Sequence, residues 1–112
     1  MSQITTHVLD VSIGRPASNM MVTLELHTGD SWQELAKGNT DSDGRVKGLL
    51  GPLVLTTGTF RLTFETGEYF AVRKTETLYP QVSIIFEVRD AHQHYHIPLL
   101  LSPFGYSTYR GS

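Results

Sequence analysis

Two histidines and one arginine are the residues of this chain best suited to chemistry. His7 and His96 stand near the start of expected strands, and Arg45 follows a tight turn. A neutral imidazole accepts a proton from water near physiological pH, and a fixed guanidinium binds a planar anion while lowering the pKa of a nearby ring. The chain has no cysteine and no serine in a Gly-x-Ser-x-Gly elbow. The set therefore favours water activated by a general base over a covalent route.

A second interpretation of His7 is structural. The segment 6–13 alternates, and one of its faces carries His7, Leu9, Val11 and Ile13. A histidine at the beginning of an apolar face is often a half-buried ring that bonds a backbone carbonyl. The sequence leaves both interpretations open, and it leaves open which histidine is the base.

Two patterns raise the question of a metal. Histidines 92, 94 and 96 fall at every second residue, which is the spacing of ligands on one strand face, but the first two lie in a polar hairpin region. Residues 39–44 space oxygens like the start of a calcium loop, yet Leu50 stands where the bidentate glutamate belongs. We expect no metal. We expect instead an Asx-rich turn, with Gly44 at positive φ, that aims Arg45 from the start of a strand.

The elements that position these residues are almost all strands. Alternation and turn residues predict an all-β sandwich with strands at 6–13, 21–27, 32–37, 59–65, 82–88, 95–101 and 106–110. A short surface helix is expected at 66–74, with Thr66 as its N-cap. Pro98 removes a backbone donor inside an apolar run, which indicates an edge or a bulge.

Composition limits the partners. A chain of 112 residues that is 39% apolar is expected to form one small domain, 1–112, which self-association would stabilise. A net charge of −2 gives no reason to expect nucleic acid or an anionic membrane. The start, MSQITTHVLD, lacks a signal-peptide layout and no apolar stretch approaches a membrane span, so we expect a cytoplasmic protein, or a peroxisomal one in a eukaryote.

Three segments carry a resemblance to a known family. The opening THVLD, the DGR turn and above all the closing HIPLLLSPFGYSTYRGS resemble the 5-hydroxyisourate hydrolases, the enzymatic branch of the transthyretin-like family. Hormone-carrying transthyretins have segments similar to LLSP and YST, but they do not end in the tetrapeptide YRGS that closes this chain. The resemblance covers nearly the whole chain and implies a two-sheet sandwich of about eight strands with one short helix.

The resemblance also implies a site and an activity. It implies catalytic roles for His7, Arg45, His96 and Ser112, and substrate contacts from His7, Arg45, Tyr109 and Ser112. The implied reaction is hydrolysis of the cyclic amide of 5-hydroxyisourate without a cofactor, in a homotetramer that is a dimer of dimers. The alternative is a transthyretin-like carrier of a small ligand that performs no catalysis.

Overall fold

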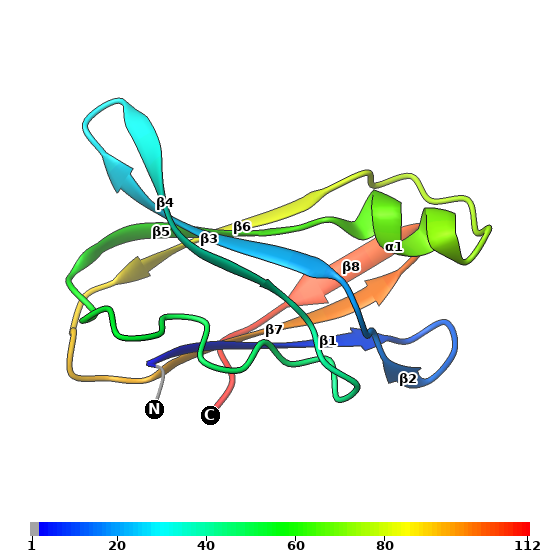
Figure 1. Ribbon diagram of the computed structural model, residues 1–112, viewed down its shortest axis with the longest axis horizontal. Coiled ribbons are helices and arrows are strands. Elements are labelled where there is room, and N and C mark those ends of the chain that lie inside the picture. Colours follow the sequence, from blue (N-terminus) through cyan, green and yellow to red (C-terminus); the bar gives the residue numbers. More distant parts are fainter. Residues whose placement is uncertain (1–2) are drawn as a thin grey trace.

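The computed structural model describes residues 3–112 as a sandwich of two sheets and one short helix (Figure 1). The elements are β1 Ile4–Asp10, β2 Arg15–Pro16, β3 Met21–Thr28, β4 Ser31–Asn39, β5 Gly58–Phe64, α1 Thr66–Val72, β6 Val82–Val88, β7 Tyr95–Ser102 and β8 Gly105–Thr108. One sheet has the order β2-β1-β7-β8 and the other β4-β3-β5-β6. The predicted all-β sandwich is confirmed, and β2 is the strand that the sequence pattern missed.

The core lies between the two sheets and is built by alternation along each strand. The second sheet buries Val22 and Leu24 of β3 with Phe60, Leu62 and Phe64 of β5, as predicted. The first sheet supplies Ile4, Val8, Leu99 and Leu101, all fully buried. Because these side chains all point inward, the residues between them on β1 and β7 lie on the outer face of the sheet.

Strand β1 differs from the prediction in its bounds and in its face. The buried side chains are the even-numbered ones from Ile4 to Asp10, whereas Val11 and Ile13 are more than half exposed. The strand ends because Asp10 Oδ1 accepts a hydrogen bond from the Ser12 backbone N–H at 3.1 Å and holds the chain in a turn. His7 is therefore on the outer face, so the expected apolar face of His7, Leu9, Val11 and Ile13 was wrong.

Pro98 lies in the middle of the first sheet, which overturns the expectation of an edge. β7 runs between β1, to which it is parallel, and β8, to which it is antiparallel. The ladder with β8 stops at the pair Leu99 and Thr108, and the same register resumes as a single bridge between His96 and Gly111. The missing N–H of Pro98 accounts for the gap, since a ladder needs that donor. The predicted strand 106–110 is accordingly shorter.

The helix is shorter than predicted and is capped differently. It spans Thr66–Val72, and Glu65 occupies the N-cap position without a capping hydrogen bond from its side chain. The expected cap, Thr66, instead donates its hydroxyl to the Tyr79 carbonyl at 2.6 Å. Among residues 3–112, no helix has the length and apolar character that crossing a membrane requires.

Candidate active site on the outer face of β1 and β7

The parallel pairing of β1 and β7 brings two histidines to one surface. Thr5 is in register with His96, and His7 is in register with Pro98. Paired residues in neighbouring strands point to the same side of a sheet, at a spacing of about 5 Å. His7 and His96 are therefore diagonal neighbours on the outer face, which the sequence hypothesis required but had no means of showing.

Arg45 reaches this face through the turn that precedes it. Asp41 Oδ1 accepts hydrogen bonds from the backbone N–H groups of Asp43 at 2.9 Å and Arg45 at 3.1 Å, and these bonds, that of Arg45 most strongly, lower the pKa of Asp41. Gly44 has φ of 79°, and a Cβ there would collide with the Val8 carbonyl oxygen. The predicted Asx-rich turn is confirmed. After the turn, Arg45 is bridged to His7 of β1.

Arg45 does not begin a strand, contrary to expectation. It forms a single antiparallel bridge with His7, next to the hydrogen bond of 2.8 Å that the Val8 N–H donates to the Gly44 carbonyl. The arginine thus joins the sheet for one residue only. This one contact is enough to place the backbone of Arg45 beside His7.

The C-terminal residues approach from the opposite side, against β7. The Gly111 N–H donates to the His96 carbonyl at 2.8 Å, and a Cβ at Gly111 would overlap Cδ2 of the His96 ring. Arg110 turns away: its guanidinium stacks 4.5 Å from the centre of the Tyr95 ring and donates to Gln93 Oε1 at 2.9 Å. Glycine is needed at 111 because the imidazole occupies the space of a side chain.

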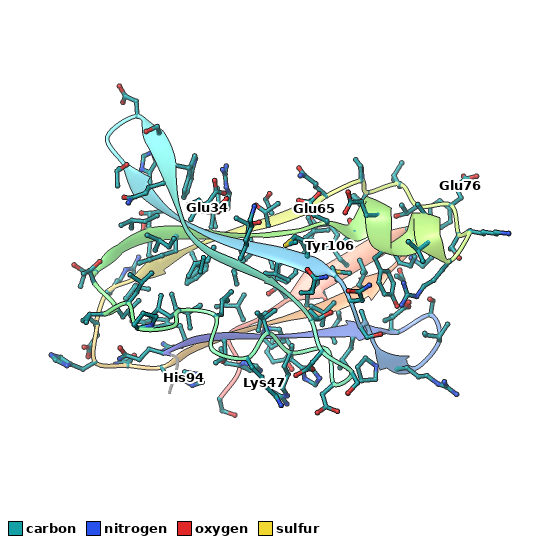
Figure 2. All side chains as sticks on the ribbon, in the orientation of Figure 1. Glu34, Lys47, Glu65, Glu76, His94 and Tyr106 are labelled. Atoms are coloured by element: carbon teal, nitrogen blue, oxygen red, sulfur yellow. The ribbon has the colours of Figure 1, made fainter. Side chains whose placement is uncertain are left out.

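A cavity of about 420 Å³ opens between these segments. Its lining comprises Thr5, Thr6, Arg45, Val46, Lys47, Gly48, His94, His96 and Ser112. Figure 2 shows Lys47 and His94 at the same edge of the molecule, next to β1. The cavity wall combines hydrogen-bond donors, hydrogen-bond acceptors and apolar groups, as in sites that bind small polar molecules.

The predicted site residues are gathered only in part. Arg45, His96 and Ser112 line the cavity, and His7 lies beside Arg45 without forming part of the lining. Tyr109 is 57% exposed and is not a lining residue. The structure thus brings three of the five predicted residues into one hollow and a fourth to its border.

A larger hollow of about 580 Å³ lies on the other side of the segment 89–95. Tyr95 and Arg110 contribute to its wall together with residues of β6, but no histidine does. The smaller cavity is the better candidate, because Arg45, His96 and Ser112 line it, whereas the wall of the larger one holds none of the predicted catalytic residues.

His96 has the electrostatic setting of a base that is neutral near pH 7. Burial lowers its pKa from the ordinary value of 6.5, and the charges of Arg45, His94 and His7 lower it further. Thr5 Oγ1 lies 2.8 Å from Nδ1 of the ring and fixes its orientation. A ring held in this way keeps a nitrogen free to accept a proton.

Six of the nine lining residues were not among the predicted site residues. Thr5 and Lys47 were not considered, and the role of His94 was left open. Thr5 precedes His7 by two residues and Lys47 follows Arg45 by two. In a strand, residues two apart share a face, so period-two spacing around the known candidates was the available signal for Thr5.

The metal hypothesis is not supported by the geometry. β7 begins at Tyr95, so His92 lies outside the strand, in the turn where its N–H bonds Asp90 Oδ1 at 2.9 Å. Within residues 3–112, no three His, Cys, Asp or Glu side chains are grouped closely enough to hold a metal ion.

Comparison with known proteins places the chain in a family. The family model described as HIUase/Transthyretin family matches residues 4–111. The chain belongs to this family. It is 42% identical over 109 residues to a 5-hydroxyisourate hydrolase of Salmonella dublin, a match that covers 97% of this chain and 80% of that protein.

Solved structures agree with the sequence relatives. The structure of Klebsiella pneumoniae 5-hydroxyisourate hydrolase is similar with a TM-score of 0.86 and 37% identity, over 97% of this chain and 98% of that one. Sea bream transthyretin in complex with thyroxine is similar with a TM-score of 0.92 and 28% identity, over 98% and 95% of the two chains. The resemblance drawn from the sequence is confirmed, and the fold is common to a 5-hydroxyisourate hydrolase and a transthyretin that binds thyroxine.

Proposed function

We propose that this protein hydrolyses 5-hydroxyisourate to 2-oxo-4-hydroxy-4-carboxy-5-ureidoimidazoline in urate degradation, without a cofactor. The observation that carries the proposal is the cavity in which Arg45, His96 and Ser112 meet, with His7 beside it. Support comes from relatives such as the Salmonella dublin 5-hydroxyisourate hydrolase, 42% identical over almost the whole chain.

Arg45 binds and orients the substrate. 5-Hydroxyisourate is a flat, oxygen-rich bicycle that is readily anionic, and a planar guanidinium offers it two parallel N–H donors. Lys47, at the same cavity wall, adds a second cation. The substrate contact expected of Tyr109 stays a prediction, because Tyr109 does not line this cavity.

The two histidines activate water. His96, kept neutral by burial and by Arg45, accepts a proton from a water that attacks the amide carbonyl, and His7 helps to position that water. Arg45 or the Ser112 hydroxyl stabilises the developing oxyanion. The proton then passes to the leaving nitrogen, which opens the ring.

The relationship to transthyretins keeps a carrier role as the second candidate. The observation in its favour is the TM-score of 0.92 to sea bream transthyretin, a protein solved with thyroxine. A carrier needs no general base, whereas this cavity presents a neutral imidazole beside a guanidinium. The two functions differ in one measurable property, which is turnover.

Decay of the intermediate tests the choice. Urate and a urate oxidase produce a transient absorbing species, and its decay is followed with and without the protein. We expect acceleration by the wild type, and a loss of roughly 10²-fold or more in a folded His96→Ala variant, as for removal of a general base. His92→Ala, which alters a turn histidine outside the cavity, is the matched control. A wild type that leaves the decay unchanged supports the carrier.

We also propose a homotetramer in which 1–112 is a single domain. From the sequence, the apolar stripe 99–101 is expected to meet a partner. Leu99 and Leu101 are buried in the core of their own chain, and only Leu100 between them stays partly exposed. Tyr106 and Tyr109 stay exposed, at 44% and 57%, and provide apolar surface for association. Sedimentation is expected to report four copies, and a fully active monomer contradicts the assembly. The cytoplasmic or peroxisomal location stays a prediction from the sequence.

A further inference from the structure

One hydroxyl group lies between two histidine rings at the edge of the cavity. Thr5 Oγ1 is 2.8 Å from Nδ1 of His96 and 2.9 Å from Nε2 of His94. The two rings are stacked with their centres 6.2 Å apart and their planes at 21°. Both distances are in the hydrogen-bonding range, so the three side chains form one continuous chain of hydrogen bonds.

The hydroxyl has a single proton, which restricts the arrangements of this chain. In one arrangement, Nδ1–H of His96 donates to Thr5, and the Thr5 hydroxyl donates to Nε2 of His94. In the other, Nε2–H of His94 donates to Thr5, and Thr5 donates to Nδ1 of His96. When His96 also carries a proton on Nε2, movement of both protons toward His94 converts the first arrangement into the second, and one unit of positive charge moves from His96 to His94.

The opposite nitrogen of His96 is the one available to substrate. Within residues 3–112, Nε2 of this ring has no hydrogen-bond partner. The one polar side-chain atom in that range that is both buried and unpartnered is Asp41 Oδ2, so Nε2 of His96 is accessible to solvent. His96 lines the cavity while Gly111 packs against the Cδ2 edge of its ring. In the first arrangement, therefore, a bare Nε2 is presented to the cavity.

Charge favours movement of the proton away from His96. Arg45 and His7 lie on the side of His96 that faces β1, so a positive charge on His96 is close to both of these groups. The ring is also half-buried, which disfavours a charge on it further. His94 is exposed to solvent, which hydrates a cation well. The charged groups near His94 are Lys47 across the cavity and Arg110, whose Nη2 donates to the His94 carbonyl at 3.1 Å.

We propose that Thr5 and His94 are positioning residues that hold His96 as an Nδ1–H imidazole and relay its Nδ1 proton to His94 during turnover. The proposal rests on the proposed function, in which His96 takes the proton of the attacking water. Neither Thr5 nor His94 needs to touch the reacting atoms for this role.

The proton balance closes over one cycle. Water gives a proton to Nε2 of His96 and its oxygen forms a bond to the amide carbon. Nδ1–H of His96 then passes to Thr5 while the Thr5 hydroxyl proton passes to His94, which becomes an imidazolium and leaves His96 neutral. When the carbon–nitrogen bond breaks, Nε2–H of His96 protonates the leaving nitrogen, and the relay runs back through Thr5. Both histidines return to their starting forms.

Nitrogen NMR of the imidazole rings tests the hydrogen-bonded chain without any substrate. We expect the Nδ1–H form of His96 in the wild type and in Thr5→Ser, which keeps the hydroxyl. Thr5→Val has nearly the same shape but no hydroxyl, so we expect His96 to lose that preference and its titration to become independent of His94. An unchanged tautomer and unchanged coupling in Thr5→Val overturn the proposal. Melting temperatures establish that each variant is folded.

Kinetics test the relay itself. We expect Thr5→Val and His94→Asn to lower kcat by roughly tenfold with little change in KM, a part of the effect of general-base catalysis, while Thr5→Ser keeps most of the rate. His94→Asn keeps a polar side chain that can hydrogen-bond but cannot take up a proton. His92→Asn, two residues away and outside the cavity, is the control and should behave as wild type.

Failure of the relay and failure of the proposed function give different experimental results. A rise in KM at unchanged kcat in both Thr5→Val and His94→Asn assigns these residues to substrate binding and overturns the relay. A wild-type rate in folded His96→Ala overturns the role of His96 in the proposed function, and the relay with it. The NMR experiment still reports in that case whether the hydrogen-bonded chain exists.

Discussion

The two faces of the sheet that contains β1 and β7 hold polar side chains in opposite states. On the inner face, Asp10 is 1% exposed and both of its carboxylate oxygens are bonded, Oδ1 to Ser12 and Oδ2 to the Tyr69 hydroxyl at 2.7 Å. On the outer face, the imidazole of His96, in register with Thr5, has one bonded nitrogen and one open nitrogen. The sheet is the same, and alternation along its strands separates the two environments.

This difference shows how a small sandwich combines stability and chemistry. A buried polar group that is fully satisfied ties elements together, here the helix α1 to β1 through Tyr69 and Asp10. A polar group at a cavity wall with only one of its two nitrogens hydrogen-bonded keeps the other nitrogen available to a reacting atom. Changes on the outer face should therefore alter turnover, and changes on the inner face should alter stability.

The largest effect is expected on the outer face. His7→Ala and Arg45→Ala should each lower turnover by roughly 10²-fold or more, because they remove a water-positioning ring and a charge-stabilising donor. Their melting temperatures should stay near the wild-type value, since neither residue belongs to the buried core. Rate measurements and thermal unfolding on the same samples check both parts. Near-wild-type rates contradict the assigned roles.

A smaller effect is expected where the tail meets the site. Gly111→Ala places a methyl group in the space of the His96 ring and should displace it, with a loss of rate on the order of 10²-fold at most for a shift of about 1 Å. Gly105→Ala is the matched control, because its nearest neighbour would be Ser102 Oγ at an ordinary 3.7 Å. Equal rates in the two variants show that Gly111 does not position His96.

On the inner face we expect a loss of stability without a loss of rate. Tyr69→Phe leaves Asp10 Oδ2 buried without its partner, which should lower the free energy of unfolding by about 1–3 kcal/mol. Denaturant titration measures this change, and the decay assay at a temperature well below unfolding should give wild-type kcat. A variant that is stable but inactive breaks the separation of the two faces.

The smallest effect is a dependence of stability on pH. Burial, together with the hydrogen bond to Asp10 and the charge of Asp10, raises the pKa of Tyr69 from 10 to about 12. The unfolded chain releases the phenol proton first, so this contribution to stability is complete below pH 10 and is lost as pH rises from 10 to 12. Unfolding at pH 9 and 11 should show a steeper decline in the wild type than in Tyr69→Phe. Parallel declines exclude the effect.

Local patterns predicted most of the strands because alternation is a property of neighbouring residues. The range of β6, Val82–Val88, was predicted without error, and β3, β5 and β7 were placed within about two residues. Errors arose where a particular side-chain hydrogen bond, local or more distant, decided the outcome. β1 ends at Asp10 because of the Ser12 turn, and α1 lacks its expected cap because Thr66 bonds Tyr79.

The sequence by itself determined the strand pattern, the turn at Gly44 and the identity of the family, since these depend on residue type and short spacing. Only the tertiary structure decided which face His7 occupies, because period two fixes alternation but not which side meets the core. It also decided that Thr5 lies between His94 and His96, which are about 90 residues further along the chain. Register between strands so far apart is set by packing across the sheet, and no local pattern encodes it.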